Sequence, residues 1–377
     1  MNIAVVKERA PGEARVALVP GDISTLTSLG ATVTVEHGAG FAAGFTDEQY
    51  QDKGAKLADR GSALSEADLL CAVRSAAAAP DSQEDLSQLK EGATVIAMMN
   101  PYGADQSFET MLQRRHQAFS LELIPRITRA QSMDVLSSQA NLAGYRSVLL
   151  GALELPKMFP MMMTAAGTVV PARVFVVGVG VAGLQAIATA KRLGAVVSAY
   201  DIRPAVKEQV QSLGAKFVEL DLDSEEAEAS GGYARQMDEE FYRKQREKML
   251  EVLSESDVVI TTAAIPGKKA PILVTREMVE AMHAGSVIVD LAAERGGNCE
   301  LTTPGETVDH RGVRITGPLN LASGLANHAS QLFSRNVTTF LKELLSDGAL
   351  SVDEEDEIVA ATLVLRDGEY RREELKG

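Results

Sequence analysis

A strand pattern that leads directly into three spaced glycines is the feature that most constrains the fold of this chain. The apolar run Val174–Val177 is followed by Gly178, Gly180 and Gly183 in a Gly-x-Gly-x-x-Gly pattern, and a helical pattern, Leu184–Leu193, comes next. A strand, a tight glycine turn and a helix in this order are typical of the first βα unit of a Rossmann-type sheet. The N-terminus of such a helix offers unpaired N–H groups to phosphates. The segment therefore predicts dinucleotide binding.

An acidic residue follows at the spacing that a dinucleotide site needs. The next apolar run, Val196–Tyr200, ends at Asp201, which lies 18 residues after Gly183, near the roughly 20 that are expected. A carboxylate there accepts hydrogen bonds from ribose hydroxyls and repels a 2′-phosphate, which favours NAD over NADP. Arg203, two residues later, could weaken this preference for NAD. Asp201 could also serve as the N-cap of a helix after Pro204, and the two roles are compatible.

Short apolar runs alternate with helical patterns along the chain, which predicts βαβ units and parallel sheets. The strands expected in the first third are Ile3–Val6, Thr32–Val35, Asp68–Val73, Thr94–Met98 and Phe119–Leu121. The helices expected among them are Gly21–Leu29, Asp47–Gly54 and Ser107–Gln117. A second series of strands is Val174–Val177, Val196–Tyr200, Lys216–Val218, Asp257–Thr261, Ser286–Asp290 and Val313–Ile315.

Two long helices are expected to connect the two series of strands. Arg129–Leu155 lacks strand signals and is rich in Ala, Leu, Ser and Gln, and Ala329–Leu345 has a helical pattern. We therefore predict an α/β fold with two Rossmann-like domains, each built on a parallel sheet. One domain comprises residues 1–135 and 322–377, and the NAD(H)-binding domain, residues 136–321, is inserted into it. Near the C-terminus, Ile358–Leu365 has a strand-like pattern.

Composition argues against several classes of protein. The formal net charge of −15 disfavours nucleic acid as a partner, because phosphate binding needs a basic face. No apolar stretch approaches the roughly 18 to 20 residues that span a bilayer, and the N-terminus does not have the pattern of a signal peptide. The two cysteines and five histidines have no spacing typical of a zinc site or a redox pair. We expect a soluble, cytosolic protein that inserts no segment into a membrane and has no metal site.

Two segments leave more than one interpretation open. The methionine-rich stretch Met158–Met163 would either line an adaptable binding surface or, as is more common, fill an irregular gap in a core. Asp221–Lys244 has acidic residues on both sides of two central glycines and is too long for a tight βα connection. It suits either a mobile lid or a solvated surface insertion.

Three segments are candidates to border the nicotinamide end of a bound dinucleotide. Thr261–Gly267 and Asp290–Ala292 follow the carboxyl ends of predicted strands, where ligands of open α/β sheets bind. Pro125–Ser138 has a dense set of charged and amide side chains at the point where the first domain leads into the long helix. By composition alone, this polar segment is more typical of an exposed helix start, with Asp134 and Arg129 in solvent.

Several motifs resemble those of the NAD(H)-binding subunit of the proton-translocating NAD(P) transhydrogenases. The most specific of them is Arg126–Ser138, which is joined by the glycine motif Gly178–Ala186. The other motifs are Tyr200–Pro204, Gly231–Ala234 and Asp290–Asn298. The resemblance covers nearly the whole chain, and it extends to a wider superfamily that includes alanine dehydrogenase and shares its two-domain fold.

The resemblance implies roles for individual residues. Arg126, Gln131, Asp134 and Ser137 would surround the nicotinamide, with Arg126 and Asp134 ordering the polar segment. Gln131 and Ser137 would orient the carboxamide and the ribose. The residues that it further implies in nucleotide binding are Ile127, Thr128, Ser132, Met133, Gly178, Val179, Gly180, Val181, Gly183, Asp201, Ile202, Arg203, Gly232, Tyr233, Gln245 and Ala264.

For some of these residues the resemblance also implies which part of the nucleotide they would contact. Asp201 and Arg203 would lie at the adenosine ribose. Gly231–Tyr233 would belong to a mobile loop that closes over the nucleotide, with Gln245 nearby. Ala264 is a departure, because relatives often have a bulkier leucine there.

The resemblance also implies partners. A transhydrogenase couples hydride transfer between NAD(H) and NADP(H) to proton passage through a membrane domain. NADP(H) would be bound by a partner subunit, and membrane-spanning subunits would hold this chain at the cytoplasmic face of the inner or plasma membrane. Relatives suggest a homodimer. The hydride would pass directly from one nicotinamide to the other, so the site would need positioning and water exclusion, and no general acid or base.

Two other hypotheses remain open. An alanine dehydrogenase must bind a 2-oxo acid and move a proton, normally with Arg, Lys and His. The chain has the arginine region around Arg15, but Arg74 ends the run in which a lysine is expected, and Met98–Pro101 has no histidine. A non-enzymatic NAD(H) sensor would fit the glycine motif and the loop equally well. Only the resemblance of Arg126–Ser138 argues against it.

Overall fold

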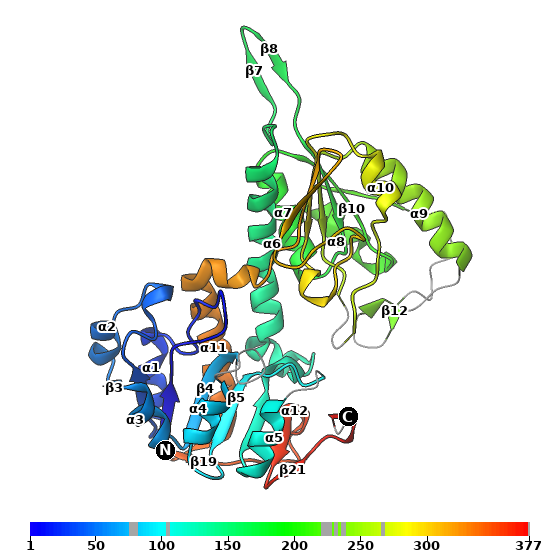
Figure 1. Cartoon of the computed structure of the whole chain (residues 1–377). Helices are drawn as coiled ribbons and strands as arrows, with labels where there is room; N and C mark the ends of the chain where they lie inside the picture. Colours follow the sequence, from blue (N-terminus) through cyan, green and yellow to red (C-terminus); the bar gives the residue numbers. More distant parts are fainter. Residues whose placement is uncertain are drawn as a thin grey trace. The chain divides into compact units, whose positions relative to one another are not determined.

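The computed structural model describes residues 1–74, 82–102, 106–219, 228–229, 233–234, 239–264 and 268–375 (Figure 1). The chain divides into two compact units, the first formed by Met1–Gln139 with Ala322–Gly377 and the second by Ala140–Leu321. Each unit is built on a sheet whose strand pairs are mainly parallel. The predicted α/β fold class is therefore confirmed.

The sheet of the first unit has the strand order β21-β20-β6-β5-β4-β1-β2-β3. Its strands are β1 (Asn2–Val5), β2 (Thr32–Glu36), β3 (Lys56–Ala58), β4 (Leu69–Arg74), β5 (Thr94–Met98), β6 (Gln117–Ser120), β20 (Leu363–Arg366) and β21 (Glu369–Tyr370). The strands from β6 to β3 pair in parallel, whereas β20 pairs antiparallel with both β6 and β21. A strand from the C-terminal segment thus extends a sheet that the N-terminal segment begins.

Helices cover both faces of this first sheet. Because side chains alternate along a strand, Ile3 packs in one core cluster with Phe333, and Ala4 packs in the other with Leu64. The helices of the first cluster include α1 (Pro20–Ser28), α2 (Asp47–Asp52), α11 (Ala326–Leu344) and α12 (Glu357–Thr362). Those of the second include α3 (Arg60–Ser65), α4 (Ser82–Gln88) and α5 (Gln106–Gln113).

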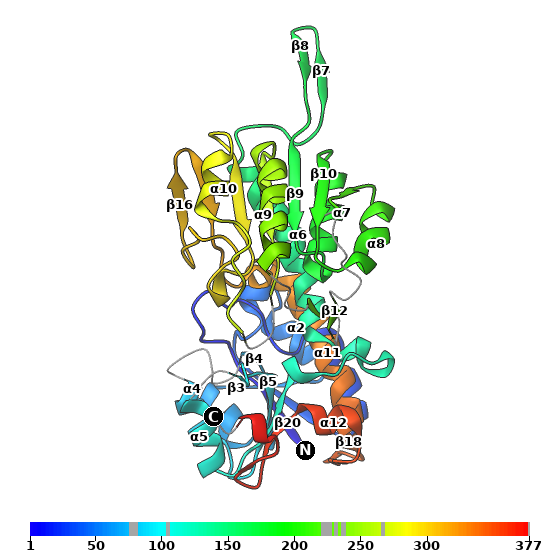
Figure 2. The same cartoon turned by 90° about the vertical axis from the view of Figure 1, so that its right-hand side faces the viewer.

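The sheet of the second unit has the strand order β11-β10-β9-β14-β15-β17-β16, and helices cover both of its faces (Figure 2). Its strands are β9 (Arg173–Val177), β10 (Val196–Tyr200), β11 (Lys216–Phe217), β14 (Val258–Thr261), β15 (Val287–Asp290), β16 (Thr307–His310) and β17 (Val313–Thr316). Val176 packs in one cluster with Ile187 of α7 (Val181–Arg192), and Phe175 packs in the other with Met249 of α9 (Glu239–Ser254). The other helices are α8 (Lys207–Ser212) and α10 (Arg276–Ala281). The long helix α6 (Val135–Glu154) begins in the first unit and ends in the second.

The strands expected from the apolar runs are present to within two residues at each end. Thr94–Met98 and Val196–Tyr200 match the prediction at both ends. The glycine motif likewise lies between β9 and α7. The alternation of hydrophobic residues was therefore sufficient to place most strands of both sheets, whereas the edge strands β3, β16 and β21 were not predicted.

Two predicted helices and one strand-like pattern differ from the structure. The helix expected at Ser107–Gln117 ends at Gln113, because Gln117 already belongs to β6. The long helix does not begin at Arg129: α6 begins at Val135 after a 3-10 helix, Thr128–Met133, because the Asp134 carboxylate accepts the Ser137 N–H and caps the first turn. The strand-like pattern Ile358–Leu365 is divided between α12 and β20. There Asp356 accepts the N–H groups of the first turn and so starts a helix in apolar residues.

Filling a gap in a core is the more common role of a methionine cluster, but the methionine-rich stretch of this chain does not do so. It leads into a hairpin of β7 (Met162–Thr164) and β8 (Gly167–Val169), which extends away from the sheet of the second unit (Figure 1). Met163 is 75% exposed and Val170 is 76% exposed. The segment therefore presents an apolar surface to solvent. In the described part of the chain, no helix is both long and apolar enough to cross a membrane.

Candidate nucleotide-binding site

The turn after β9 is shaped by close contacts between main-chain atoms. Gly178 has a φ of +95°, and a Cβ at Gly183 would lie 2.0 Å from the Gly178 carbonyl oxygen. The Thr262 hydroxyl donates a hydrogen bond of 2.8 Å to that same oxygen. The turn is thus packed between the start of α7 and the end of β14, and only glycine fits at either position.

Gly180 has no such packing constraint. A Cβ at Gly180 would meet nothing within 4 Å, and its φ of −83° is open to any residue. Gly180 is the N-cap of α7, and no side chain caps this helix. The first N–H groups of α7 therefore have no intrahelical partner beside an open surface, which is the arrangement that binds phosphates.

Asp201 lies at the end of β10 with four donors on its carboxylate. Oδ2 accepts the Val179 N–H at 2.7 Å and Nη2 of Arg203 at 2.9 Å. Oδ1 accepts the N–H of Arg203 and its Nε, each at 2.9 Å. The N-cap of the following 3-10 helix, Pro204–Val206, is Arg203, so the proposed capping role of Asp201 is wrong.

Other predicted nucleotide-binding residues of the second unit surround this turn or lie outside the described residues. Gln245 of α9 is buried and donates a hydrogen bond of 3.0 Å to the Tyr200 hydroxyl, directly before Asp201. Val181 and Ala264 are exposed, and Ile202 is partly buried. Gly231 and Gly232 lie outside the described residues, and Tyr233 is described only as a strand position. The predicted lid therefore stays a prediction.

Sequence reasoning gave no role to Asn298, which holds the main chain beside Ala264. Asn298 Oδ1 accepts the Ala263 N–H at 3.0 Å, and its Nδ2 donates to the Ala263 carbonyl at 2.8 Å. The buried Asp290 in turn accepts the Asn298 N–H at 2.7 Å. The sequence indicated Asn298 as the last residue of the motif Asp290–Asn298, but this motif does not indicate which main-chain segment Asn298 binds.

The polar segment predicted at the nicotinamide lies in the first unit. Arg126, Thr128, Gln131 and Ser132 are exposed, Ile127 is partly buried, and Met133 is 1% exposed. Asp134 accepts the Ser137 N–H at 2.9 Å and the Ser137 hydroxyl at 2.6 Å. The segment therefore presents polar side chains while one apolar residue anchors it in the core.

Two further contacts hold this segment to the C-terminal part of the first unit. Asn336 of α11 donates to the Ser132 carbonyl at 2.7 Å and accepts the Ser138 hydroxyl at 2.7 Å. Arg129 forms ion pairs with Glu343 at 3.1 Å and Asp356 at 2.5 Å. The composition-based interpretation is correct for Arg129, which is exposed and has two acidic partners. It is wrong for Asp134, which is partly buried.

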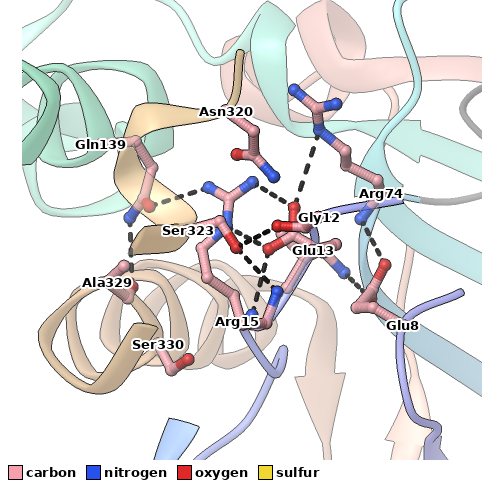
Figure 3. Close-up of polar contacts among 12 residues, drawn as sticks. Glu8, Gly12, Glu13, Arg15, Arg74, Gln139, Asn320, Ser323, Ala329 and Ser330 are labelled. Carbon is pink, nitrogen blue, oxygen red and sulfur yellow. Dashed lines mark hydrogen bonds and ion pairs between the residues drawn. The ribbon is translucent and has the colours of Figure 1, made fainter. Parts of the chain in front are cut away.

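The arginine region that an alanine dehydrogenase would use forms a buried ionic cluster in this chain (Figure 3). The side chains of Arg15 and Glu13 are 2% and 0% exposed. Arg15 Nε and Nη2 donate to the two Glu13 oxygens at 2.8 and 2.7 Å, and Nη1 donates to Gln139 at 2.9 Å. Arg74 Nε lies 3.8 Å from Glu13. The forked face of Arg15 is therefore bound to a carboxylate of the protein itself.

Glu8 adjoins this cluster. It is partly buried, and its carboxylate accepts the N–H groups of Val73 at 2.6 Å and Arg74 at 3.2 Å. Burial raises the pKa of Glu8 to about 7, and the nearby Glu13 charge adds to that rise against the opposing effect of the N–H donors.

The site has few groups for covalent or metal chemistry. Among the described residues, no group of three or more His, Cys, Asp or Glu is arranged to hold a metal ion. Cys71 and Cys299 are buried, and burial raises the pKa of both thiols, that of Cys299 to about 11. A thiolate nucleophile is therefore disfavoured at neutral pH.

Both parts of the chain match models of one protein family. Residues 4–143 match "Alanine dehydrogenase/PNT, N-terminal domain", and residues 147–373 match "Alanine dehydrogenase/PNT, C-terminal domain".

Similar proteins distinguish between members of that family. An NAD(P) transhydrogenase alpha subunit of Rhodospirillum rubrum is 51% identical over 372 residues, which are 98% of this chain and 97% of the relative. A transhydrogenase structure from Sinorhizobium meliloti has a TM-score of 0.88 at 47% identity, covering 98% of this chain and 100% of the other. An L-alanine dehydrogenase structure has a TM-score of 0.81 at 24% identity, covering 100% and 98%. The last similarity shows the fold, whereas the first two favour a transhydrogenase subunit over an alanine dehydrogenase.

Substitution of the second and the third glycine of the turn, Gly180 and Gly183, should have different effects. At Gly183 a methyl group would collide with a main-chain oxygen, so Gly183→Ala should lower the free energy of unfolding by more than about 3 kcal/mol. Gly180→Ala should change it by less than about 1 kcal/mol, yet weaken NADH binding at least about tenfold, because the methyl group would face the pyrophosphate. Urea unfolding and calorimetric titration with NADH check both. Undiminished NADH binding by Gly180→Ala would show that the pyrophosphate does not lie there.

The raised pKa of Glu8 predicts a pH-dependent stability. An unfolded glutamic acid ionises near pH 4.5, whereas folded Glu8 keeps its proton until about pH 7. The folded state therefore binds one more proton between these values, and the contribution of Glu8 to stability falls as pH rises, by about 1 to 3 kcal/mol in total. Glu8→Gln should lack this fall in urea unfolding from pH 4.5 to 7.5, while exposed Glu91→Gln keeps it. Parallel profiles for Glu8→Gln and the unmodified chain would show that folded Glu8 is ionised.

Proposed function

The chain belongs to the alanine dehydrogenase/PNT family, and within it we propose that this protein is the NAD(H)-binding subunit of a proton-translocating NAD(P) transhydrogenase. The proposal rests on one observation: the chain is similar over nearly its whole length to a protein named as an alpha subunit of NAD(P) transhydrogenase. In this proposal NADP(H) is bound by a partner subunit. Hydride transfer is coupled to proton translocation by membrane-spanning subunits, which hold this chain at the cytoplasmic face of the membrane.

The residues of the second unit suit the adenosine and pyrophosphate parts of NAD(H). The open surface at Gly180 and the uncapped start of α7 would receive the pyrophosphate. Asp201 at the end of β10 would receive the adenosine ribose. The residues that we propose around the nucleotide in this unit are Gly178, Val179, Gly180, Val181, Gly183, Asp201, Ile202, Arg203, Gly232, Tyr233, Gln245 and Ala264.

The polar segment of the first unit would orient the nicotinamide. The Ser137 hydroxyl donates to Asp134, so its oxygen is directed to accept from a carboxamide N–H. The exposed Gln131 amide has both a donor and an acceptor for the same group. The proposed contacts in this unit are Arg126, Ile127, Thr128, Gln131, Ser132, Met133, Asp134 and Ser137.

Catalysis in this proposal consists of positioning. A bound nicotinamide supplies or accepts the hydride at its own C4. Asp134 fixes the rotamer of Ser137, and Asn336 and Arg129 hold the segment that bears both. A displacement of about 1 Å in such a segment is enough to slow a reaction about a hundredfold. No side chain in this scheme gains or loses a proton.

Hydride transfer tests the proposal directly. The purified chain with NADH and an NADP analogue should turn over only when a transhydrogenase NADP(H)-binding domain is added. Gln131→Ala should lower kcat about 10- to 100-fold without a change in Tm, because it loses an orienting amide. The exposed Gln113→Ala is the matched control and should leave kcat unchanged. Turnover with alanine and NAD by the chain alone would support the alanine dehydrogenase alternative instead.

The exposed hairpin of the second unit is the surface that we propose for a homodimer. Met161, Met163 and Val170 are 59%, 75% and 76% exposed, which is typical of side chains that another protein covers. A second copy of the chain presents the same hairpin, so a twofold axis would bring the two hairpins into contact with each other.

Charge placed on the hairpin should separate such a dimer. We expect Met163→Lys combined with Val170→Lys to convert the dimer to a monomer in sedimentation, because two cations would have to be buried in the contact. Ile272→Lys, at another exposed apolar residue of the second unit, should leave the dimer intact. A monomeric unmodified chain would refute the homodimer, and a dimeric double variant would place the contact elsewhere.

A further inference from the structure

The hydrogen bonds on Asp201 leave little capacity for a ligand. A carboxylate has about four lone-pair sites. Four hydrogen bonds of 2.7 to 2.9 Å reach Asp201, from the Val179 N–H, the Arg203 N–H, and Nε and Nη2 of Arg203. The side chains of Asp201 and Arg203 are 7% and 16% exposed, so water contributes little to the pair. A ribose hydroxyl that binds Asp201 must therefore displace one of these donors.

Two of the four donors, Nε and Nη2 of Arg203, can move without movement of the main chain. The Val179 N–H belongs to the glycine turn, which the contacts of Gly178 with Gly183 and Thr262 fix in place. The Arg203 N–H is held by the chain as it leaves β10. The guanidinium of Arg203, in contrast, turns away by rotation about side-chain bonds, although it would also lose a bond of 3.3 Å to the Val179 carbonyl.

We infer that the Arg203 guanidinium is a displaceable stand-in for the adenosine ribose hydroxyls, and that its release sets the selectivity between NAD(H) and NADP(H). The inference rests on the proposed NAD(H) binding and assigns the selectivity to one side chain. Two hydroxyls of NAD(H) can donate to Asp201 in place of Nε and Nη2. A 2′-phosphate cannot, because it has no proton to donate and carries the same sign of charge.

Arg203 acts in opposite directions on the two nucleotides. For NAD(H) it is a competitor within the protein, since its ion pair with Asp201 must break before the ribose binds. For NADP(H), Arg203 is a cation that lies two positions after Asp201 in the sequence and attracts the 2′-phosphate. A residue that only stabilises the fold would shift both affinities in the same direction.

Arg203→Met tests this opposition in calorimetric titrations of the full chain, without a partner domain. Loss of the competing ion pair should tighten NADH binding about three- to tenfold, and loss of the cation should weaken NADPH binding by a similar factor. The ratio of the NADPH Kd to the NADH Kd should therefore rise by about tenfold or more. The exposed Arg192→Met removes one positive charge from the same unit and should leave the ratio unchanged.

Asp201 variants test the other half of the pair. Asp201→Asn should weaken NADH binding and lower the ratio of the NADPH Kd to the NADH Kd, since the repelling charge is gone and Arg203 remains. The double variant Asp201→Asn with Arg203→Met should not show the lowered ratio of the NADPH Kd to the NADH Kd that Asp201→Asn shows alone. Should Arg203→Met fail to fold, Arg203→Lys keeps the charge without the fork, and it should tighten NADH while NADPH binding is retained.

Several outcomes would overturn the inference. Weaker NADH binding by a folded Arg203→Met would show that the guanidinium binds the nucleotide instead of competing with it. Equal shifts for both nucleotides would indicate a structural role. Failure of the proposed function is distinguishable: absence of hydride transfer with the partner domain would refute the transhydrogenase subunit, and it would leave these affinities unaffected.

Discussion

The contact of the Gly178 carbonyl with Gly183 is the constraint on which the candidate nucleotide site depends. It brings the end of β9 and the start of α7 too close together for any side chain, and the Thr262 hydroxyl joins the end of β14 to the same oxygen. Three elements thereby converge on one carbonyl. The Val179 N–H that reaches Asp201 and the uncapped first turn of α7 are both placed by this turn. The surface proposed for the pyrophosphate and the carboxylate proposed for the ribose are consequently parts of one rigid arrangement.

The first unit positions its polar segment by a different principle. No glycine turn is involved; instead a short 3-10 helix is tied to α11 by Asn336, and Asp134 determines where α6 begins. The contacts of Asn336 and Arg129 join residues near position 130 to residues beyond position 330. The main chain of the segment is therefore held in place, although its polar side chains face solvent.

Periodic and local patterns were sufficient to predict most strands of the two sheets, the glycine turn and Asp201, but not the edge strands β3, β16 and β21. Those features depend on neighbours in sequence: alternation within a strand, glycine spacing within one turn, and an acid at the next strand end. The features that were missed depend on distant partners. Nothing in the sequence indicates that Asn298 binds the main chain at Ala263, or that Met163 faces solvent in a hairpin. The residues proposed for the nicotinamide rest on family resemblance for the same reason.

The division of the first unit between the two ends of the chain has a consequence during synthesis on the ribosome. Hydroxyls of Ser323, Ser330 and Ser334 satisfy main-chain N–H groups of residues 14, 16 and 19, and Phe333 and Phe340 complete the core around β1. The N-terminal segment therefore emerges long before its partners exist, whereas the second unit is contiguous. We expect the later-made unit to fold first, while the first waits with an open hydrophobic face that chaperones would protect.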